Sequence, residues 1–544
     1  MTIVQVVPAT TNHPGDAETW NDSKLWDPGL FKEEGAEIVF GIGAYTAHQR
    51  IPVGDHVTVR GATPIPLPTD RLTQVTMDPA KMAVLTCIPK SPNPNKKGGV
   101  ETAGFRLEKS VGTTLTDLYL LGYQGIDFLA TQNATAERVV VQHYVGDWPN
   151  GYYCWFQQTG AFFVHGGSNG TKLIDCSGIS QHHTFLNHDG GWIKNSLWDG
   201  CRSFYAGCGK EADGTGYRDW TVGGDGGEEC DIDGLVIRNG TFIGAGKCGI
   251  YFEPEVTGTK TGNRTTPFVR KNVLIEGNLC GQNGRYGGGI LGQMRIKEGE
   301  QAGIFAGSGT IRGNTLWDNA KANIYSRQEY NVDPLVVEGN VCVGSNVGIL
   351  LELGGAAGTF RDNVVWKPKK YGFKMMGKGA VIGTGNEVTV EGGAEAYHLG
   401  GYTRVYLQDS REAGHQALVK STSAETFWGM SNLSLSGRVQ SPGPLYAVHP
   451  GTTVQTSRIA LTRAENLTAP VLPGAVPDEK PPVVDEPVPE VVLPPKPEPF
   501  ILCEDGALKN VMTDGRVLMQ VGGFMQPDAA AEFPHGTIWR RVVE

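Results

Sequence analysis

The sequence predicts an all-β protein that folds as a right-handed parallel β-helix, and three observations support this prediction. The 544 residues include 76 glycines and only 19% charged side chains, which favours many strands and tight turns over helices. A Gly-Asn or Asp-Asn corner recurs at intervals of 36, 26, 23 and 23 residues from Asn278 to Asn386. Alternating apolar residues flank each corner, as in short β-strands. Repetition on this scale indicates a solenoid, and parallel crossovers are almost always right-handed.

The corner repeat is clearest in four segments that superimpose residue by residue. In each segment, alternating apolar residues lead to the corner Asn, and apolar residues follow it. Stacked Asn side chains can hydrogen-bond from one coil to the next, so we predict one column of Asn at a shared corner. The segments are Leu274–Cys280, Thr310–Leu316, Val336–Cys342 and Thr359–Val365, and their corner residues are Asn278, Asn314, Asn340 and Asn363.

A second short strand alternates with the corner segments and begins with Gly-Ile, Asn-Ile or Gly-Phe. Successive side chains of a strand point to opposite faces, so this pattern separates an inward column from two outward columns. The predicted inward column is Ile250, Ile290, Ile324, Ile349 and Phe373. The first outward column is Tyr251, Leu291, Tyr325, Leu350 and Lys374, and the second is Glu253, Gln293, Arg327, Glu352 and Met376.

The first coil is predicted from two segments, Gly35–Thr46 and Ile51–Gly61, in which apolar residues again alternate. Together with the later coils, this opening resembles that of pectate-lyase-like β-helix proteins, including bacteriophage tailspikes and tail-associated proteins. The resemblance covers about residues 30–400 and concerns the fold pattern, so it names no substrate. Because tailspike-like β-helices are commonly homotrimers, the resemblance implies a homotrimer.

These patterns divide the chain into five regions. Residues 1–34 are predicted to form an N-terminal arm and cap, residues 35–400 the β-helix, and residues 401–468 an irregular β cap. Residues 469–499 are predicted to be a linker, because 11 of the 32 prolines fall in residues 470–499 among acidic residues, and such a segment cannot build a core. Residues 500–544 contain Gly-Gly and Asp-Gly turns and one apolar run, which predicts a small C-terminal β module.

Charge and hydropathy restrict the partners and the location. A net charge of −10 and a pI near 5.7 argue against binding of nucleic acid, which requires clustered Lys and Arg. No segment reaches the roughly 18 apolar residues of a membrane span, so we expect no membrane insertion. Residues Met1–Pro8 lack the basic leader and apolar run of a secretory signal, which favours another route of release, such as the lysis that frees virions.

The ten cysteines contain no Cys-x-x-Cys pair, so neither a zinc knuckle nor a redox motif is predicted. Cys280 and Cys342 each follow a corner Asn by two residues, which is the position of a stacked interior side chain. We therefore predict buried free thiols. A disulfide among Cys201, Cys208 and Cys230 is the alternative.

Acid–base chemistry on a polysaccharide requires two carboxylates at a suitable separation, or a base beside a cation that neutralises a uronate. Carboxylates are densest around a predicted insertion at residues 207–234, and we select Asp225 and Glu253 as catalytic candidates. The Gly-rich acidic segment Gly223–Glu229 is either a solvated loop or a calcium site made of carboxylates and carbonyls. No other cofactor is predicted.

The outward columns supply the candidate ligand-binding residues. Aromatic rings can stack on sugar faces while carboxylate and guanidinium groups bind hydroxyls. Alternatively, Arg327 and Glu352 form an ordinary ion pair between coils. The candidates are Tyr251, Glu253, Gln293, Tyr325, Arg327 and Glu352.

Two known activities of this fold are not carried over to the chain. Among the motifs of polygalacturonase-type hydrolases, only Arg295-Ile296-Lys297 is present, and the Asp-Asp pair and the Gly-His-Gly are absent. The Asp-Pro-His of alginate epimerases is absent as well.

Three hypotheses about function follow. The leading one is a phage virion protein of the tail, that is, a tail spike, tail fibre or minor tail protein, which contacts other virion proteins and the polysaccharide of the host cell surface. The second is an extracellular polysaccharide lyase or hydrolase. The third is a capsid decoration or head-fibre protein that binds no ligand.

Overall fold

The chain divides into two compact units, residues 1–144 with 152–475 and residues 145–151 with 476–544. The computed structural model describes residues 3–6, 28–47, 50–87, 104–122, 125–143, 160–179, 183–188, 191–204, 206, 225–228, 230–252, 268–284, 301–328, 334–353, 357–377, 379–400, 404–413, 418–421, 432–440, 444, 446–448, 452–462, 470, 472, 512–513 and 516–517.

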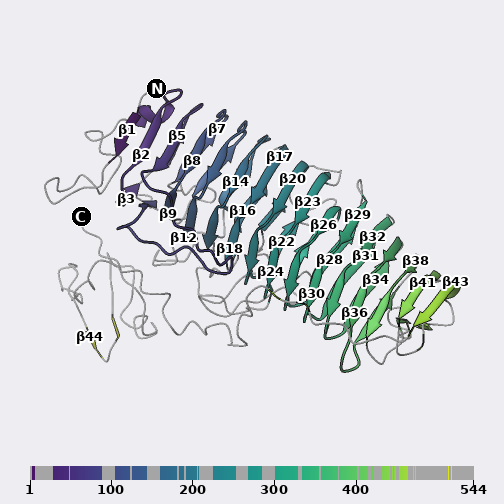
Figure 1. Ribbon diagram of the computed structural model, residues 1–544. Helices are drawn as coiled ribbons and strands as arrows, with labels where there is room; N and C mark the ends of the chain where they lie inside the picture. Colours follow the sequence, from purple (N-terminus) through teal and green to yellow (C-terminus); the bar gives the residue numbers. More distant parts are fainter. Residues whose placement is uncertain are drawn as a thin grey trace. The chain divides into compact units, whose positions relative to one another are not determined.

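The first unit is a stack of coils in which each turn contributes three strands (Figure 1). One strand of each turn belongs to a 14-stranded parallel sheet. The other two belong to a 29-stranded sheet made of two rows, which we call the β2 row and the β3 row after early strands in each. Each strand pairs in parallel with the strands one turn before and one turn after it, so the prediction of a right-handed parallel β-helix is confirmed.

The 14-stranded sheet contains β4 (Ile51–Val53), β7 (Phe105–Glu108), β10 (Ile126–Leu129), β13 (Gly160–His165), β16 (His183–His188), β19 (Asp225–Glu228), β22 (Cys248–Phe252), β25 (Ala302–Phe305), β28 (Ala322–Gln328), β31 (Val347–Leu353), β34 (Tyr371–Gly377), β37 (Glu395–Leu399), β40 (Val419–Ser421) and β42 (Tyr446–Val448).

The β2 row contains β1 (Ile3–Val6), β2 (Glu37–Phe40), β5 (Thr58–Gly61), β8 (Thr114–Thr116), β11 (Thr135–Glu137), β14 (Lys172–Ile174), β17 (Trp192–Asp199), β20 (Asp231–Arg238), β23 (Arg270–Glu276), β26 (Gly309–Arg312), β29 (Leu335–Glu338), β32 (Ala357–Arg361), β35 (Ala380–Thr384), β38 (Arg404–Gln408), β41 (Asn432–Gln440) and β43 (Thr453–Thr462).

The β3 row contains β3 (Gly43–Ala47), β6 (Ala83–Cys87), β9 (Leu118–Gly122), β12 (Val140–His143), β15 (Ser177–Ile179), β18 (Arg202–Phe204), β21 (Thr241–Ile243), β24 (Leu279–Gly281), β27 (Thr315–Trp317), β30 (Val341–Val343), β33 (Val364–Trp366), β36 (Glu387–Thr389) and β39 (Arg411–Ala413). One short 3-10 helix, η1 (Pro28–Lys32), precedes β2. In the second unit, β44 (Met512–Thr513) pairs antiparallel with β45 (Arg516–Val517).

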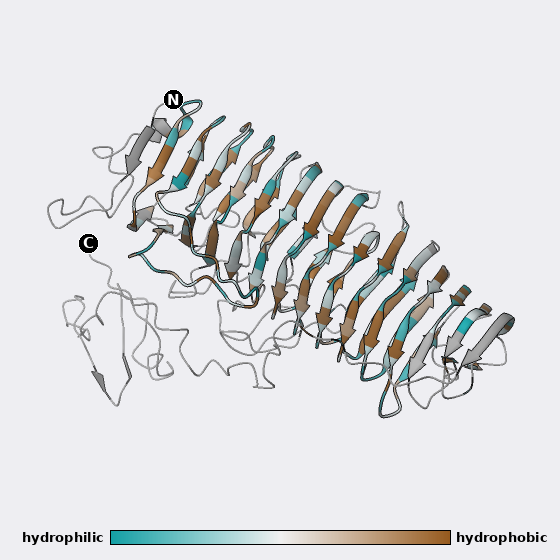
Figure 2. Cartoon of the chain, in the orientation of Figure 1, coloured by the Kyte–Doolittle hydropathy of each residue, from teal (hydrophilic) through white to brown (hydrophobic). Residues whose placement is uncertain are grey.

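Apolar side chains fill the coil, and hydrophobic residues recur along the strands (Figure 2). The predicted inward column is confirmed at Ile250, Ile324, Ile349 and Phe373, all of them fully buried. Its remaining place belongs to Ile304 of β25, which lies between Ile250 and Ile324 in the register. The assignment of this place to Ile290 is therefore wrong, and Ile290 itself lies outside the described residues. Gly289-Ile290 and Gly303-Ile304 have the same local pattern, and only the second of these pairs forms a strand of this column.

The Asn column is confirmed and extends to Asn386. The backbone N–H and the side-chain Nδ2 of each Asn donate to Oδ1 of the next Asn, so that Asn340 receives both bonds from Asn314 at 3.0 and 2.9 Å. Nδ2 also donates to a carbonyl of the preceding coil, as from Asn340 to Ile311 at 2.9 Å. All five Asn are fully buried, so the ladder satisfies backbone groups that water cannot reach. The five are Asn278, Asn314, Asn340, Asn363 and Asn386.

A second polar ladder runs at the next corner of the coil. Asn283 donates from Nδ2 to Oδ1 of Asn319 at 2.9 Å, and Asn319 donates in the same way to Asn323 at 2.8 Å. Ser345 continues the ladder with a 2.6 Å hydrogen bond to Asn323. The members of this ladder do not share one local motif, so the sequence does not predict it.

Charges alternate along the outer face of the β2 row. One register column contains alternating acids and arginines on successive turns. Arg238 lies 2.6 Å from Asp199, and Arg312 lies 2.7 Å from Glu276. Such exposed pairs contribute little to stability but keep like charges apart. The column is Asp199, Arg238, Glu276, Arg312, Glu338 and Arg361.

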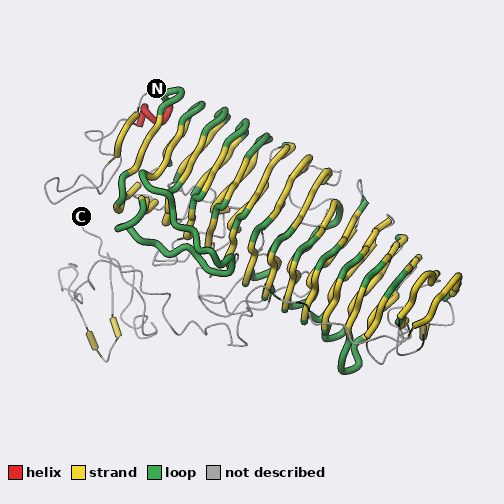
Figure 3. The backbone as a smooth tube through the Cα atoms, in the orientation of Figure 1, coloured by secondary structure: helices red, strands yellow, loops and turns green. Residues whose placement is uncertain are grey.

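Residues 62–82, between β5 and β6, form a strap that lies over the β3 row (Figure 3). Arg71 Nη2 donates to the carbonyls of Gly240 at 2.6 Å and Gly277 at 3.2 Å. Arg202 donates in the opposite direction, to strap carbonyls. The apolar side chains packed together beneath this region are Leu72, Ile179, Phe204, Ile243, Leu279, Trp317, Val343 and Leu472.

Beyond residue 400 the strands β38, β41 and β43 continue the β2 row in parallel pairing. Seven cysteines of the described residues are buried, and the free thiols among them include Cys87, Cys176, Cys201, Cys280 and Cys342. The prediction of buried free thiols is confirmed for these five. Cys208, the third cysteine of the alternative disulfide, lies outside the described residues.

Candidate functional site

The first outward column exists, but its rings are covered. Tyr251, Phe305, Tyr325, Leu350 and Lys374 follow one another in register across β22, β25, β28, β31 and β34. Phe305 holds the place predicted for Leu291, so that assignment is wrong, and Leu291 itself lies outside the described residues. Tyr251 and Tyr325 are each only 3% exposed. Their rings pack against Phe305, with centroids 5.5 and 4.8 Å apart, in an apolar cluster separate from the main core. The expectation that these two tyrosines offer open faces to a sugar is therefore wrong.

The second outward column is partly described. Arg327 and Glu352 are register partners on β28 and β31, and both side chains are half-buried. Glu352 accepts a 2.7 Å hydrogen bond from the hydroxyl of Tyr325. This carboxylate therefore helps to hold the aromatic cluster in place. Glu253 and Gln293 lie outside the described residues, so their predicted roles stay predictions.

Asp225 faces the interior of the coil. Its register partner on β22 is Ile250, a member of the inward column. The side chain is fully buried, and its Oδ1 accepts hydrogen bonds from the backbone N–H groups of Thr184 and Phe185, both at 2.8 Å. A catalytic carboxyl must reach the bond that it cleaves, so this enclosed position argues against the catalytic role predicted for Asp225.

The carboxyl of Asp225 is electrostatically unusual. Burial raises its pKa from 3.8 to about 6, although the two backbone amides and the nearby His183 partly offset the effect. The Ser203 hydroxyl donates to Thr184 Oγ1 at 2.9 Å, and Oδ2 of Asp225 has no hydrogen-bond partner in the part of the chain that the structure describes. Oδ1 of Asp225 links β19 to β16 through its two hydrogen bonds. Oδ2 is buried without a hydrogen bond, and this desolvation disfavours the ionised carboxylate.

Residues 223–229 are predicted to be either a solvated loop or a calcium site, and the structure describes residues 225–228 of this segment. Residues 225–228 form β19, a strand of the 14-stranded sheet, rather than a solvated loop. Gly226 has φ +153°, and a Cβ there would lie 2.0 Å from the carbonyl oxygen of Tyr251. The glycines therefore allow two backbones to approach closely. Within the described residues, no group of three or more His, Cys, Asp and Glu is placed to hold a metal ion.

A cluster that sequence analysis missed lies on the outer face of the same sheet, near its N-terminal end. Asp127 on β10 and His165 on β13 are joined by a 2.6 Å hydrogen bond between Oδ1 and Nε2. Arg50 and Arg106 approach the other oxygen of Asp127, Oδ2, at 3.6 and 3.9 Å. Four groups that can donate or accept hydrogen bonds therefore meet at one place.

Phe163 completes this cluster. Its ring lies on the ring of His165, with centroids 4.3 Å apart, and its side chain is half-buried. The side chains of Arg50, Arg106 and His165 are 27%, 28% and 21% exposed, so solvent reaches the cluster. An aromatic surface bordered by planar polar groups can bind the apolar face and the hydroxyls of a sugar ring. We call Arg50, Arg106, Asp127, Phe163 and His165 the N-terminal cluster.

A sequence signal for the N-terminal cluster was present. Gly125-Ile-Asp-Phe-Leu129 follows the same Gly-Ile template as Gly249-Ile-Tyr-Phe. Applying that template would place Asp127 in the first outward column, where the register indeed puts it beside Phe163. The contact with His165 on the next coil depends on side-chain conformations that the template does not describe.

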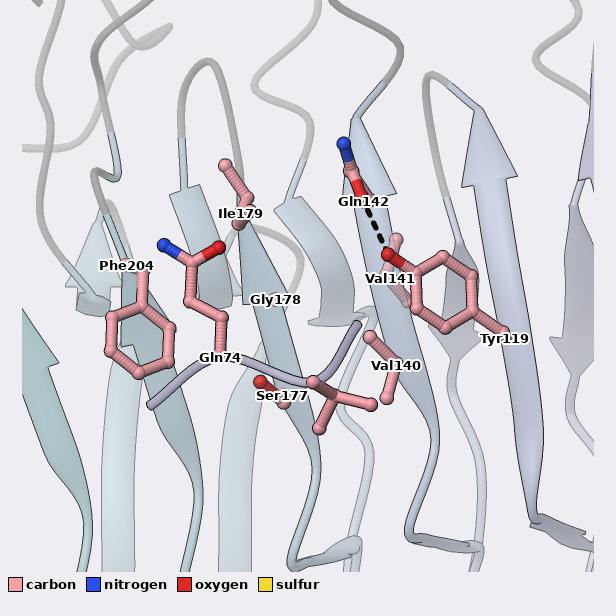
Figure 4. Close-up of a pocket in the computed structure, with 10 residues that line it drawn as sticks. Gln74, Tyr119, Val140, Val141, Gln142, Ser177, Gly178, Ile179 and Phe204 are labelled. Carbon is pink, nitrogen blue, oxygen red and sulfur yellow. Dashed lines mark hydrogen bonds between the residues drawn. The ribbon is translucent and has the colours of Figure 1, made fainter. Parts of the chain in front are cut away.

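A small hollow lies between the strap and the β3 row (Figure 4). Its volume is about 190 Å³, below the roughly 300 Å³ at which ligand pockets begin. Tyr119 donates to Gln142 at 2.5 Å along its wall. The hollow is therefore a packing feature of the strap, and we do not assign it a ligand.

None of the helices in the described residues is long and apolar enough to cross a membrane.

Comparison with known proteins supports the architecture. Residues 222–391 match the family model described as right handed beta helix region. No match was found among curated proteins. The catalytic domain of a GH87 alpha-1,3-glucanase solved with tetrasaccharides is similar at 11% identity and a TM-score of 0.37, over 79% of this chain and 64% of that domain. The chain thus spans less than two thirds of the glucanase domain.

Two further solved structures are similar at the same level. A surface adhesin of Streptococcus pneumoniae matches at 12% identity and a TM-score of 0.33, over 80% of this chain and 85% of the adhesin. The Dettilon tailspike protein matches at 10% identity and a TM-score of 0.33, over 78% of this chain and 62% of the tailspike. The parallel pairing of the strands and the family model together show that the fold of this chain is a right-handed parallel β-helix.

Proposed function

We propose that this protein is a component of a phage tail, of the tail spike, tail fibre or minor tail type, that binds the polysaccharide of the host cell surface. The N-terminal cluster on the outer face of the 14-stranded sheet carries the binding part of the proposal. The virion location and a homotrimeric state rest on the resemblance of the first coils to tailspikes.

The chemistry of the N-terminal cluster suits a sugar. The ring of Phe163 supplies apolar area, and the guanidinium groups of Arg50 and Arg106 donate to hydroxyls. The hydrogen bond between His165 and Asp127, together with the nearby guanidinium groups of Arg50 and Arg106, holds Asp127 in place before a ligand arrives. A strand of a rigid sheet positions such groups more reproducibly than a loop does.

One observation favours a second candidate function, a polysaccharide depolymerase. A carboxylate that accepts a hydrogen bond from one nitrogen of a histidine orients the ring and leaves the other nitrogen for proton transfer. Asp127 and His165 have this relation, with 2.6 Å between Oδ1 and Nε2. Cleavage of a bound polysaccharide by the wild-type protein, lost in Asp127→Asn, would establish this function.

Affinity gel electrophoresis of the full-length protein against a panel of bacterial capsular and O-antigen polysaccharides tests the proposal. We expect at least one polysaccharide to retard the wild type. Phe163→Ala and Arg106→Gln should each lower the affinity measured from this retardation by about tenfold, because each removes contacts worth about 1.4 kcal/mol. Antibody labelling of intact particles tests the location, and a sedimentation mass tests the trimer.

Arg312→Gln is the matched control for Arg106→Gln. It removes an arginine from the charge column of the β2 row, on a different sheet, and should bind like the wild type. Thermal melting of all three variants checks that each is folded. Equal retardation of wild type and both cluster variants would refute the role of the N-terminal cluster, and no retardation by any polysaccharide would refute the proposed function.

A further inference from the structure

We propose that a second subsite near the C-terminal end of the same outer face binds an anionic substituent of the polysaccharide, so that one polymer contacts both ends of the 14-stranded sheet. This inference rests on the proposed function and adds to it the charge and the minimum length of the ligand. The residues that form the second subsite are Tyr371, Lys374, Glu395, His398 and Lys420, which we call the C-terminal cluster.

The register brings three nitrogen-bearing side chains together. Lys374 on β34, His398 on β37 and Lys420 on β40 occupy successive turns of one outward column. Neighbouring strands lie about 4.8 Å apart, so the backbones of the two lysines, one on each side of His398, are about 10 Å from each other. Long lysine side chains can converge on one anionic group between them. Lys370, which acts electrostatically on Lys374, adds a further positive charge.

Glu395 organises the C-terminal cluster. It accepts a 2.6 Å hydrogen bond from Nδ1 of His398 and lies 3.1 Å from Nζ of Lys420. Tyr371 packs on the other side, with its ring centroid 4.5 Å from that of His398. Lys374 Nζ lies 5.2 Å from the centre of the Tyr371 ring. The positions of His398 and both lysines are thereby determined before a ligand is bound.

One atom of this cluster has an unmet hydrogen-bonding capacity. The His398 side chain is only 3% exposed, and its Nε2 has no hydrogen-bond partner among the residues that the structure describes. A buried imidazole nitrogen without a partner costs free energy. A sugar hydroxyl would satisfy Nε2 by donating a hydrogen bond to it. The geometry therefore points to a polar ligand group beside His398.

Electrostatics favours an anion at this position. Burial lowers the pKa of Lys374, while Glu352 and Glu395 partly counteract the effect. A further negative charge would stabilise the ammonium form of this lysine. Lys370, Lys374 and Lys420 outnumber Glu352 and Glu395 by one charge, before any charge on His398 is counted. A carboxylate or phosphate on the polymer has the required chemistry.

The separation of the two clusters sets the length of the ligand. Eight strand-to-strand steps in the 14-stranded sheet lead from β13 to β37. At about 4.8 Å per step, the N-terminal and C-terminal clusters lie roughly 38 Å apart along the sheet. A polymer that spans this distance gains from two linked contacts, whereas a short oligomer occupies one cluster at a time.

Calorimetric titration of the full-length protein with polygalacturonate tests the inference, with short and long size fractions and with dextran as a neutral polymer. We expect the long fraction to bind about 100-fold more tightly than the short one. The double variant Lys374→Gln with Lys420→Gln should lose at least tenfold in affinity for the long fraction. The charge-matched double variant Lys172→Gln with Lys194→Gln, on the β2 row, should bind like the wild type.

Two results would overturn the inference. One is equal affinity of the lysine double variant and the wild type for long polygalacturonate. The other is affinity that does not depend on polymer length. Either result leaves the proposed function standing if Phe163→Ala still weakens retardation by a cell-surface polysaccharide. Absence of retardation by every polysaccharide of the panel, with the lysine result intact, would instead remove the proposed function.

Discussion

Replacement of Asn340 by Leu should destabilise the β-helix strongly, because Asn340 lies in the middle of the buried Asn ladder. Its Oδ1 accepts two hydrogen bonds from Asn314, and its Nδ2 donates to Ile311 and Asn363. Leucine has the same branched shape at Cγ and is somewhat larger, so the substitution removes the hydrogen bonds without leaving a cavity. The residue is fully buried, and water cannot replace the lost partners.

The magnitude follows from the groups that would be left without a partner. The backbone N–H of Asn314 would lose its acceptor, and the carbonyl of Ile311 would lose the donor that reaches it from Asn340. The Nδ2 of Asn314 would keep its second bond, to Ile275. Two buried backbone groups without partners cost about 1–3 kcal/mol each. We therefore expect a loss of about 2–6 kcal/mol in the free energy of unfolding.

Guanidinium denaturation measures this loss, and hydrogen exchange locates it. Coils of a solenoid contact only their neighbours, so exchange should accelerate in the turns that contain Asn314, Asn340 and Asn363 more than elsewhere. Asn169→Leu is the control, because Asn169 accepts an exposed hydrogen bond from Asn195 outside the ladder. A loss below about 1 kcal/mol, or equal losses in the two variants, would refute the reasoning.

Two further predictions concern the interior. Asp225 has a folded-state pKa of about 6 against 3.8 in the unfolded chain, so its contribution to stability falls as pH rises from about 4 to 6. Asp225→Asn should therefore gain stability relative to the wild type across this window, up to about 3 kcal/mol at pH 7, and a difference in melting that does not change with pH would contradict this. Ile349→Asp places an unpaired charge in the inward column and should prevent soluble expression, whereas a folded variant with an unchanged melting temperature would show that the register is wrong.

Local pattern alone was sufficient for the architecture. The Asn corners and the alternating apolar residues recur at nearly equal intervals, and a stack of identical backbone turns translates equal intervals into aligned columns. Asn278 and Asn363 lie 85 positions apart in the sequence, yet their shared motif was enough to place both in one ladder. The inward column followed for the same reason at Ile324 and Ile349.

The candidate site depended on the tertiary structure, because the period of a strand says which face a side chain occupies but not what covers that face. Tyr251 and Tyr325 have the predicted outward position and are nevertheless buried. Asp225 lies in a Gly-rich acidic segment that resembles a loop, yet its strand pairs with β22 and turns the carboxyl inward. Asp127 and His165 come together only because the coil closes after 38 residues. Sequence periodicity determined the stack of coils in this protein, whereas side-chain packing across different coils decided which polar groups meet and which remain open to a ligand.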